Sequence, residues 1–209
     1  RLFFTLWKPR GNRCQLWALQ GKKETTGMVE VKALLAKGFS SYRVDQLLSF
    51  LGHADRRIRL ESQFELANRK ETKSLRAKAI DSKSALLPRL HALWGLGQLK
   101  ARDRDLLKLI CQDKDAEMRA QAARWAGDLG FDPDNLVPDL LRDPSPRVRL
   151  MAGIACGKLM SKDALEPISK LIVDAGNKET VLRHAGIFGL AGVASPRELK
   201  SLSEHSSEA

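Results

Sequence analysis

The sequence predicts an all-α fold, a right-handed α-solenoid of about five two-helix repeats. The first observation is an arginine that recurs every 30 residues as Arg59, Arg89, Arg119 and Arg149, and again after 34 residues as Arg183. The second is its shared surroundings, because an apolar residue precedes each arginine and a small residue follows three positions later. The third is composition: only 6% of the 209 residues are aromatic, so the core must come from aliphatic contacts between closely packed helices. An internal repeat of this length makes each repeat pack mainly against its neighbours.

The first 27 residues lie outside the repeat pattern. Apolar residues alternate with other residues along 2–6 and again along 14–18, on either side of the turn-forming stretch 9–12. This alternation predicts a β-hairpin, or the last strand of a preceding domain. Residues 21–27 are rich in Gly, Lys and Thr and are predicted to be a linker. The segment 1–27 is therefore a short N-terminal part with β character.

The repeat domain is predicted to span residues 28–199. Its first helix covers 28–37, and Gly38 is a suitable helix stop. In each repeat a first helix, a short turn and a second helix follow one another, and the second helix begins near the repeat arginine. The first helices are predicted at 44–51, 72–80, 105–111, 136–141 and 165–173. Residues 200–209 form a polar tail.

The repeat arginines are candidates for a structural ladder. An arginine at the start of a buried helix needs carbonyl or carboxylate partners. Aspartates in the adjoining turns can supply them, so an internal ladder that holds repeat against repeat is favoured over a role in ligand binding. The predicted ladder consists of Arg59, Arg89, Arg119, Arg149 and Arg183 with Asp55, Asp115 and Asp143.

The second helices also predict where a ligand would bind. Counted from the repeat arginine, only positions +2, +6 and +9 are left for solvent, and they form one narrow stripe on a helical wheel. Second helices line the concave face of a solenoid of this type, so the stripe should line an inner groove. The candidate groove residues are Glu61, His91, Gln98, Gln121, Trp125, Asp128 and Met151.

Trp125 is the residue of most interest in this stripe. The aromatic residues of other repeats stand at +5, as Trp94 does, whereas Trp125 stands at +6 and Arg124 takes position +5. An exposed tryptophan beside amide side chains would be a good anchor for a peptide or a flat ligand. The alternative is a local twist that keeps Trp125 in the core while Arg124 extends to solvent. Trp94 is predicted to be a core residue.

Composition and motifs give no catalytic site. The net charge is +11, and it resides in residues 1–104, which hold 22 basic and 9 acidic residues. Such a half could attract an acidic protein, a nucleic acid or an anionic surface, or its dispersed lysines could simply keep the domain soluble. No nucleophile–base pair, phosphate loop or cluster of Cys and His is evident, so we predict no enzyme activity, cofactor or metal. Cys111 and Cys156 are predicted to be buried free thiols.

The pattern of each repeat resembles the HEAT family. The shared features are a Leu-rich first helix, an Asp-bearing turn and an Arg-x-x-Ala sequence in the second helix, as in Arg119–Ala122. The period of 30 is shorter than is usual for HEAT repeats. The stretch 88–92 has a faint similarity to the ankyrin signature, but it occurs in one repeat only. Tetratricopeptide repeats would keep a period of 34 throughout.

A narrower resemblance concerns three stretches, 31–39 (VKALLAKGF), 57–67 (RIRLESQFELA) and 89–99 (RLHALWGLGQL). Together they resemble large planctomycete-type proteins described as membrane-bound dehydrogenases or haem-binding proteins. That family joins a β-propeller, a HEAT-like segment and a cytochrome c domain, and the resemblance covers about residues 28–130. It implies a spacer or interaction segment of an exported redox-type protein, in the cell envelope or periplasm, with the cytoplasm as the alternative. The chain begins with Arg1 and shows no signal-peptide pattern, so we expect a fragment or a processed form.

The function predicted from these features is a non-catalytic, monomeric module for protein interaction or domain organisation. Its partner is expected to be a protein, a peptide or a neighbouring domain of the same parent chain, with no membrane span. The alternative is a nucleic-acid-binding domain similar in class to the HEAT-like alkylpurine DNA glycosylases. Such a groove would be rimmed by Lys and Arg, whereas the predicted stripe holds one basic residue, Lys158. Binding of a specific nucleic acid is therefore not expected. A third hypothesis, a chromophore lyase or a chaperone, is supported by the repeat type alone.

Overall fold

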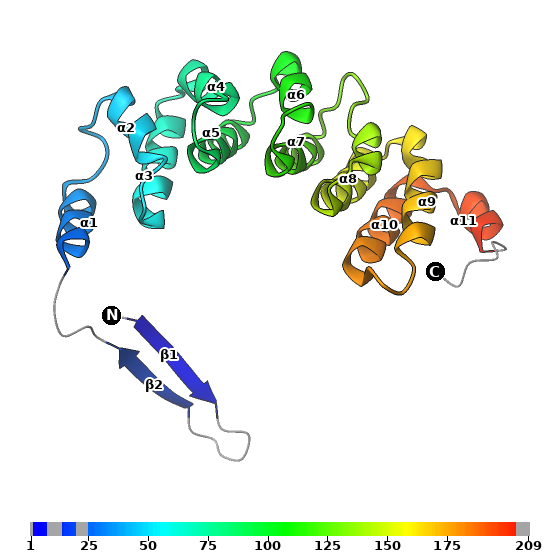
Figure 1. The fold of residues 1–209 in the computed structure, drawn as a ribbon, viewed down its shortest axis with the longest axis horizontal. Helices are drawn as coiled ribbons and strands as arrows, with labels where there is room; N and C mark the ends of the chain where they lie inside the picture. The colour runs from blue at the N-terminus through cyan, green and yellow to red at the C-terminus, as the bar shows by residue number, and fades with distance from the viewer. Residues whose placement is uncertain (1, 8–13, 20–24, 204–209) are drawn as a thin grey trace. The chain divides into compact units, whose positions relative to one another are not determined.

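The computed structural model describes residues 2–7, 14–19 and 25–203 (Figure 1). It divides the chain into an N-terminal unit that ends at Ser41 and a larger unit that begins at Tyr42, which we call the repeat domain. The predicted turn at 9–12, most of the linker 21–27 and the tail from 204 onward lie outside the described residues.

The N-terminal unit contains a hairpin and one helix. Strands β1 (Leu2–Trp7) and β2 (Cys14–Leu19) pair antiparallel, with Leu2 opposite Leu19 and Trp7 opposite Cys14. Helix α1 (Thr26–Lys37) is capped by the hydroxyl of Thr25 and ends at Gly38, whose φ of 75° lies in the left-handed region that glycine adopts without strain. The predicted helix stop at Gly38 is therefore confirmed. The division at Ser41 groups α1 with the hairpin, whereas the sequence pattern started the repeat domain at residue 28.

The repeat domain consists of helix pairs that follow one another along an arc (Figure 1). The first helices lie on the outer side of the arc and the second helices on the inner side. The pairs in chain order are α2 (Val44–Phe50) with α3 (Arg56–Asn68), α4 (Thr72–Ile80) with α5 (Leu86–Gln98), α6 (Arg104–Cys111) with α7 (Ala116–Leu129), the 3₁₀ helix η1 (Pro138–Arg142) with α8 (Pro146–Leu159), and α9 (Leu165–Ala175) with α10 (Thr180–Val193). The short 3₁₀ helix η2 (Lys162–Ala164) precedes α9, and α11 (Pro196–Leu202) follows the last pair. The predicted solenoid of five two-helix repeats is confirmed.

The fourth repeat departs from the prediction, because its first helix is a short 3₁₀ helix and not an α-helix over 136–141. The carboxylate of Asp132 accepts hydrogen bonds from the backbone N–H groups of Leu136 and Val137, both at 2.9 Å. Pro138 follows and has no N–H to donate. The local hydrogen bonds therefore replace those that an α-helix would need at its start.

Most second helices end in the same way, at position +11 from the repeat arginine. The residues there are Lys70, Lys100, Gly130 and Met160, and all four have a positive φ between 51° and 58°. The left-handed conformation closes the helix and directs the chain into the next repeat. Only Gly130 adopts it without a Cβ penalty.

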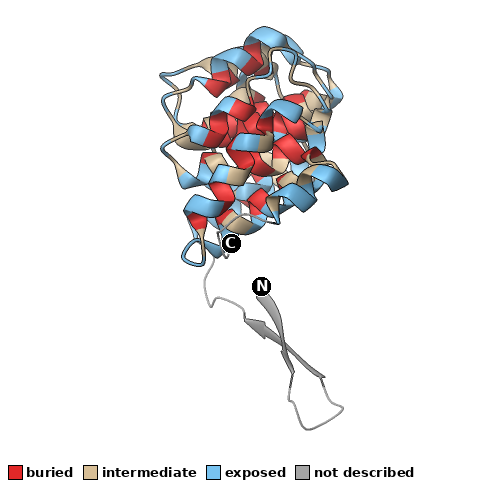
Figure 2. Cartoon of the chain, turned by 90° about the vertical axis from the view of Figure 1, so that its right-hand side faces the viewer, coloured by how far each residue is buried: buried red, intermediate tan, exposed pale blue. Residues whose placement is uncertain are grey.

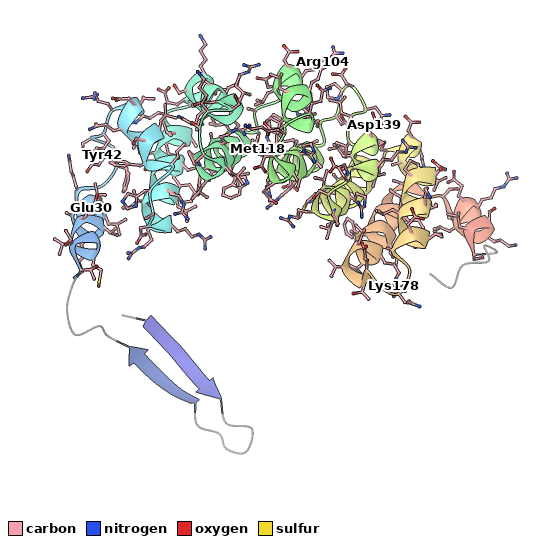
Figure 3. The ribbon with its side chains drawn as sticks, viewed as in Figure 1. Glu30, Tyr42, Arg104, Met118, Asp139 and Lys178 are labelled. Atoms are coloured by element: carbon pink, nitrogen blue, oxygen red, sulfur yellow. The ribbon has the colours of Figure 1, made fainter. Side chains whose placement is uncertain are left out.

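The core lies between the two layers of helices. Figure 2 shows that buried residues gather in the interior of the repeat domain and that exposed residues cover its outside. Met118 of α7 is fully buried and lies between the layers, while Arg104 and Asp139 lie on the outer side (Figure 3). The side chains buried in this core are mostly leucine, isoleucine, valine and alanine, as the low aromatic content predicted.

Candidate functional site

The repeat arginines bind the turn that precedes their own helix. Nη1 of Arg119 donates to the carbonyl oxygens of Asp113 at 2.7 Å and Lys114 at 3.3 Å. Arg59 and Arg149 donate to the carbonyls at the same two positions of their own turns, at 2.7 to 3.1 Å. Arg89 differs, because its Nε donates to the carbonyl of Ala79 at the end of α4. Each guanidinium thus holds the start of the second helix against the segment that precedes it.

The same arginines also reach the next repeat. Arg119 forms a bidentate pair with the carboxylate of Asp143, at 2.7 and 2.9 Å. Arg89 pairs with Asp113, and Nη2 of Arg149 lies 4.0 Å from the carboxylate of Glu179. The Arg119 guanidinium holds the pKa of Asp143 below its usual range, chiefly through this hydrogen bond. A ladder between repeats therefore exists, and we call these three ion pairs its rungs.

Two of the predicted ladder aspartates have a different role. Asp55 and Asp115 cap helices α3 and α7 by accepting a hydrogen bond from the N–H two residues later. Asp55 also pairs with Arg57 and not with Arg59. The rung carboxylates that the sequence analysis missed are those of Asp113 and Glu179. Arg183, the last ladder arginine, bonds the side chain of Asn177 in its own turn.

The first ladder arginine lacks a rung. Position −6 from the repeat arginine is Asp113 or Asp143 in the third and fourth repeats, but in the second repeat it is Lys83. Nε of Arg59 donates instead to Nε2 of His91, at 3.1 Å. Among the described residues no carboxylate lies within ion-pair distance of Arg59.

The predicted solvent stripe is wrong at position +6. At +6, Ala155 and Gly189 lie in the contact between neighbouring second helices, opposite Gly127 and Gly157 at +8 of the preceding repeat. A Cβ on Gly127 would lie 2.9 Å from the Cα of Ala155, and one on Gly157 would lie 3.0 Å from the Cα of Gly189. Small residues at these positions let α7, α8 and α10 pack backbone against backbone.

Trp125 occupies the same contact between α5 and α7. A Cβ on Gly97 would lie 3.5 Å from Cδ1 of the Trp125 ring. The tryptophan is only 5% exposed, so the alternative stated above is confirmed: Trp125 is in the core and Arg124 extends to solvent. Its bulk replaces the small residue that the later repeats place there, which spaces α5 from α7. Trp94, predicted to be core, is only half-buried.

The other predicted groove residues fall into two classes. His91 and Gln121 are 2% and 4% exposed, which contradicts the expectation that position +2 faces solvent. They turn inward because α3, α5 and α7 pack against one another along this side. Glu61, Gln98 and Asp128 are exposed as predicted, and Met151 is half-buried.

A hollow of about 620 Å³ nevertheless lies where the groove was predicted, over the inner sides of α3, α5 and α7. We call it the α3–α5–α7 hollow. Five predicted residues line it, namely His91, Gln98, Gln121, Trp125 and Asp128. Glu61 and Met151 are not among its lining residues. The lining residues that the sequence analysis did not assign to a site are Arg56, Leu60, Gln63, Leu87, Leu93, Gly97, Arg124 and Leu129, together with Arg59 and Trp94, which it had given other roles.

Hydrogen bonds fix the polar floor of the hollow. Nδ1 of His91 donates to Oε1 of Gln63 at 2.7 Å, because its Nε2 already accepts from Arg59. Burial, and then the charge of Arg59, lower the pKa of His91 to about 4, so the ring is neutral at pH 7. The ring also meets Trp94 edge to face, with centroids 4.9 Å apart. Nε1 of Trp94 donates to Oε1 of Gln121 at 2.9 Å.

The rim of the hollow carries more positive than negative charge. Arg56 is exposed and has no ion-pair partner among the described residues. Asp128 is the carboxylate of the lining, and it is already paired with Arg124 and with Lys158 of the next repeat. The indole N–H of Trp125 is buried without a hydrogen-bond partner in the described part of the chain. A ligand would therefore meet a surface that is rich in donors.

The described residues contain no cluster of His, Cys, Asp and Glu that could hold a metal ion. No helix within 25–203 is long and apolar enough to cross a membrane. Cys111 and Cys156 are buried free thiols, as predicted, and burial raises the pKa of each to about 12. Neither thiol is a candidate nucleophile at neutral pH.

Comparison with known proteins agrees with this architecture. Residues 104–191 match the family model of HEAT repeats, so the repeats of this chain are HEAT-like. HEAT repeats generally mediate protein–protein interaction. No curated protein matches the chain.

Proposed function

We propose that this chain is a non-catalytic module that binds a protein or peptide on the inner side of its second helices. The observation that carries the proposal is the α3–α5–α7 hollow, which joins apolar surface from Trp94, Leu60 and Leu87 to fixed polar groups. Pockets that bind ligands combine these two kinds of surface. The hydrogen bonds of His91 and Trp94 hold the lining in one arrangement, which lowers the entropic cost of binding.

The charges of this side support a protein partner over a nucleic acid. A groove for nucleic acid needs many unpaired basic groups, because phosphate contacts dominate the affinity. Here Arg124 and Lys158 are both paired with Asp128. Glu61 is exposed on α3 and directly follows Leu60, which lines the hollow, and its charge would repel phosphates. Trp125 is buried, so it offers no open face on which a base could stack.

We also propose that the module organises domains within a larger exported redox-type protein. Support comes from the resemblance of residues 28–130 to the planctomycete-type proteins and from the HEAT-like architecture. In that case the occupant of the hollow would be a neighbouring domain of the same parent protein.

Site-specific crosslinking tests the proposal. The photoreactive residue benzoylphenylalanine replaces Gln98, which is exposed and lines the hollow. The variant is expressed in the cells that naturally make the protein. The matched control replaces Lys108, which is exposed on the outer helix α6. We expect a crosslink to one identifiable polypeptide, or to another region of the same protein, at position 98 and not at position 108. Equal labelling at both positions, or none at position 98, would contradict the proposal.

A further inference from the structure

The ladder defines what is missing at its first position. In three consecutive repeats the guanidinium of the ladder arginine meets a carboxylate of the next repeat, as Arg119 meets Asp143. At Arg59 the corresponding positions of the next repeat are Lys83, in place of an aspartate, and Ala85, in place of Glu179. Nη2 of Arg59 has no hydrogen-bond partner among the described residues.

The guanidinium of Arg59 is nonetheless held in place. Its Nε is bound by His91 and its Nη1 by the carbonyl oxygens of His53 and Ala54, which leaves Nη2 as the group still able to donate. The side chain lines the α3–α5–α7 hollow, and so does Arg56 one turn earlier in α3. Two arginines without carboxylate partners therefore stand on the same helix at one edge of the hollow.

We propose that the hollow accepts an acidic side chain, a glutamate or aspartate, from a peptide segment of a protein partner. The incoming carboxylate would accept hydrogen bonds from Arg59 and Arg56 and would take the place that Asp113, Asp143 and Glu179 hold in the other repeats. Apolar residues next to it would lie against Trp94 and Leu87. The proposal rests on the proposed function and names the chemistry of the partner.

Physical chemistry supports a carboxylate at this place. Arginine and carboxylate form paired, charge-assisted hydrogen bonds, which are stronger than neutral ones. The fixed contacts of Arg59 mean that little side-chain entropy is lost on binding. The lining carries three arginines and one carboxylate, Asp128, and that carboxylate is already paired. The charge that remains without an ion-pair partner at the hollow is thus positive.

The test begins with a phage-displayed library of random dodecapeptides, selected on the folded chain. We expect enriched peptides to contain an Asp or Glu next to an apolar residue. A synthetic fluorescein-labelled peptide from this set should bind at least about tenfold more weakly to Arg56→Gln, because a charge-assisted pair is lost. Arg142→Gln removes the same charge from an exposed arginine of η1 and should bind the peptide like the wild type.

A double-mutant cycle between the peptide and Arg56 keeps the test independent of folding defects in Arg59 variants. Replacing the peptide's acidic residue by its amide should cost about tenfold on the wild type and much less on Arg56→Gln, which is the signature of a direct pair. For Arg59→Gln, circular dichroism first establishes that the variant keeps the helix content of the wild type, and its affinity is measured only then. Rescue of binding to Arg56→Glu by a peptide with Lys at the acidic position would support the same contact.

Three outcomes would overturn the inference. Enriched peptides without acidic residues, whose binding is lost on crowding the hollow with Gln98→Trp, would leave the proposed function intact but remove the carboxylate. A selection that enriches no peptide would contradict both. Tighter binding of a 12-nucleotide single strand or its duplex than of any peptide, with the same loss in Arg56→Gln, would favour a nucleic acid.

Discussion

A ladder arginine joins two turns with one guanidinium group. Arg119 binds the carbonyls of its own turn and the carboxylate of Asp143 in the next one, and both side chains are largely buried. Removing the arginine leaves the carboxylate of Asp143 without its counter-charge in a poorly hydrated place. Breaking such a pair costs far more than breaking an exposed one.

We therefore expect Arg119→Ala to lower the free energy of unfolding by about 3 kcal/mol. Arg142→Ala is the control, because its pairs with Asp139 and Glu166 are exposed and long, at 3.9 and 3.6 Å, and it should cost under about 1 kcal/mol. Urea denaturation followed by circular dichroism measures both. Equal midpoints for the two variants would show that the rung does not stabilise the domain.

His91 makes stability depend on pH. Its pKa in the folded protein is about 4, whereas a histidine in an unfolded chain has its ordinary value near 6.5. Between these values the unfolded state binds more protons, so the stabilising contribution is complete above pH 6.5 and is lost as pH falls toward 4. The loss should amount to about 1–3 kcal/mol.

The measurement compares unfolding free energies at pH 7.0, 6.0 and 5.0 for the wild type and His91→Gln. This range keeps aspartates such as Asp143, whose pKa is lowered, in their charged form. The variant should show a shallower pH dependence than the wild type. His184→Gln, at an exposed position of α10, should keep the full dependence. Parallel curves for wild type and His91→Gln would disprove the role of His91.

Between the second helices from α5 to α10, the side chain at +6 of the following helix sets the spacing. Trp125 stands there against Gly97, and α7, α8 and α10 meet through glycine and alanine instead. An exposed Trp125, as the groove interpretation required, could be truncated at little cost. Because Trp125 is 5% exposed, Trp125→Ala should instead cost about 3–5 kcal/mol.

A pair of milder substitutions separates burial from hydrogen bonding. Trp125→Phe removes an indole N–H that has no partner within the described residues, so it should cost under about 1 kcal/mol. Trp94→Phe breaks the hydrogen bond to Gln121 and should cost about 1–2 kcal/mol despite the greater exposure of Trp94. Thermal unfolding followed by circular dichroism compares them. The reverse order would mean that the indole of Trp125 is satisfied in solution.

Two glycines at position +8 give a matched test of the helix contacts. Alanine is favoured over glycine inside a helix by about 0.5–1 kcal/mol. At Gly97 a Cβ would make an ordinary contact with the Trp125 ring, at 3.5 Å, so Gly97→Ala should stabilise the domain. At Gly127 the Cβ would lie 2.9 Å from backbone and side-chain atoms of Ala155, so Gly127→Ala should destabilise it by about 1–3 kcal/mol. If both substitutions shift the melting temperature in the same direction, the packing argument fails.

Charge over the chain predicts only weak contact with DNA. The net charge of +11 gives a general attraction to phosphates. Because that attraction depends on released counterions, we expect duplex binding to fall steeply between 50 and 200 mM salt. Fluorescence anisotropy with unrelated duplexes should give similar affinities. Sub-micromolar binding at 150 mM salt that depends on sequence or on a lesion would instead make DNA the functional ligand.

Much of this architecture could be predicted because single residues recur at fixed positions of each repeat. The arginine spacing located every second helix, and Gly38 marked the end of α1 correctly. The orientation of those helices could not be predicted from a wheel, because a wheel does not show that +6 faces the neighbouring repeat. Trp125 at +6 was misplaced for this reason, and His91 and Gln121 at +2 because a wheel does not show how α3, α5 and α7 pack against one another. The hollow that these residues line nevertheless lies over the predicted helices. The rung at Asp113 was missed because the pattern does not show which aspartate of the turn, Asp113 or Asp115, meets Arg89.

The glycine contacts also determine how stiff each joint of the array is. Where α7, α8 and α10 touch through Gly127, Gly157 and Gly189, backbone meets backbone, and no rotamer can change to let one helix tilt on the next. The joint between α5 and α7 is filled by the ring of Trp125, which has two rotatable bonds. Bending of the array should therefore concentrate at that joint. An occupant of the hollow would sit across it and would lock the curvature of the array as it binds.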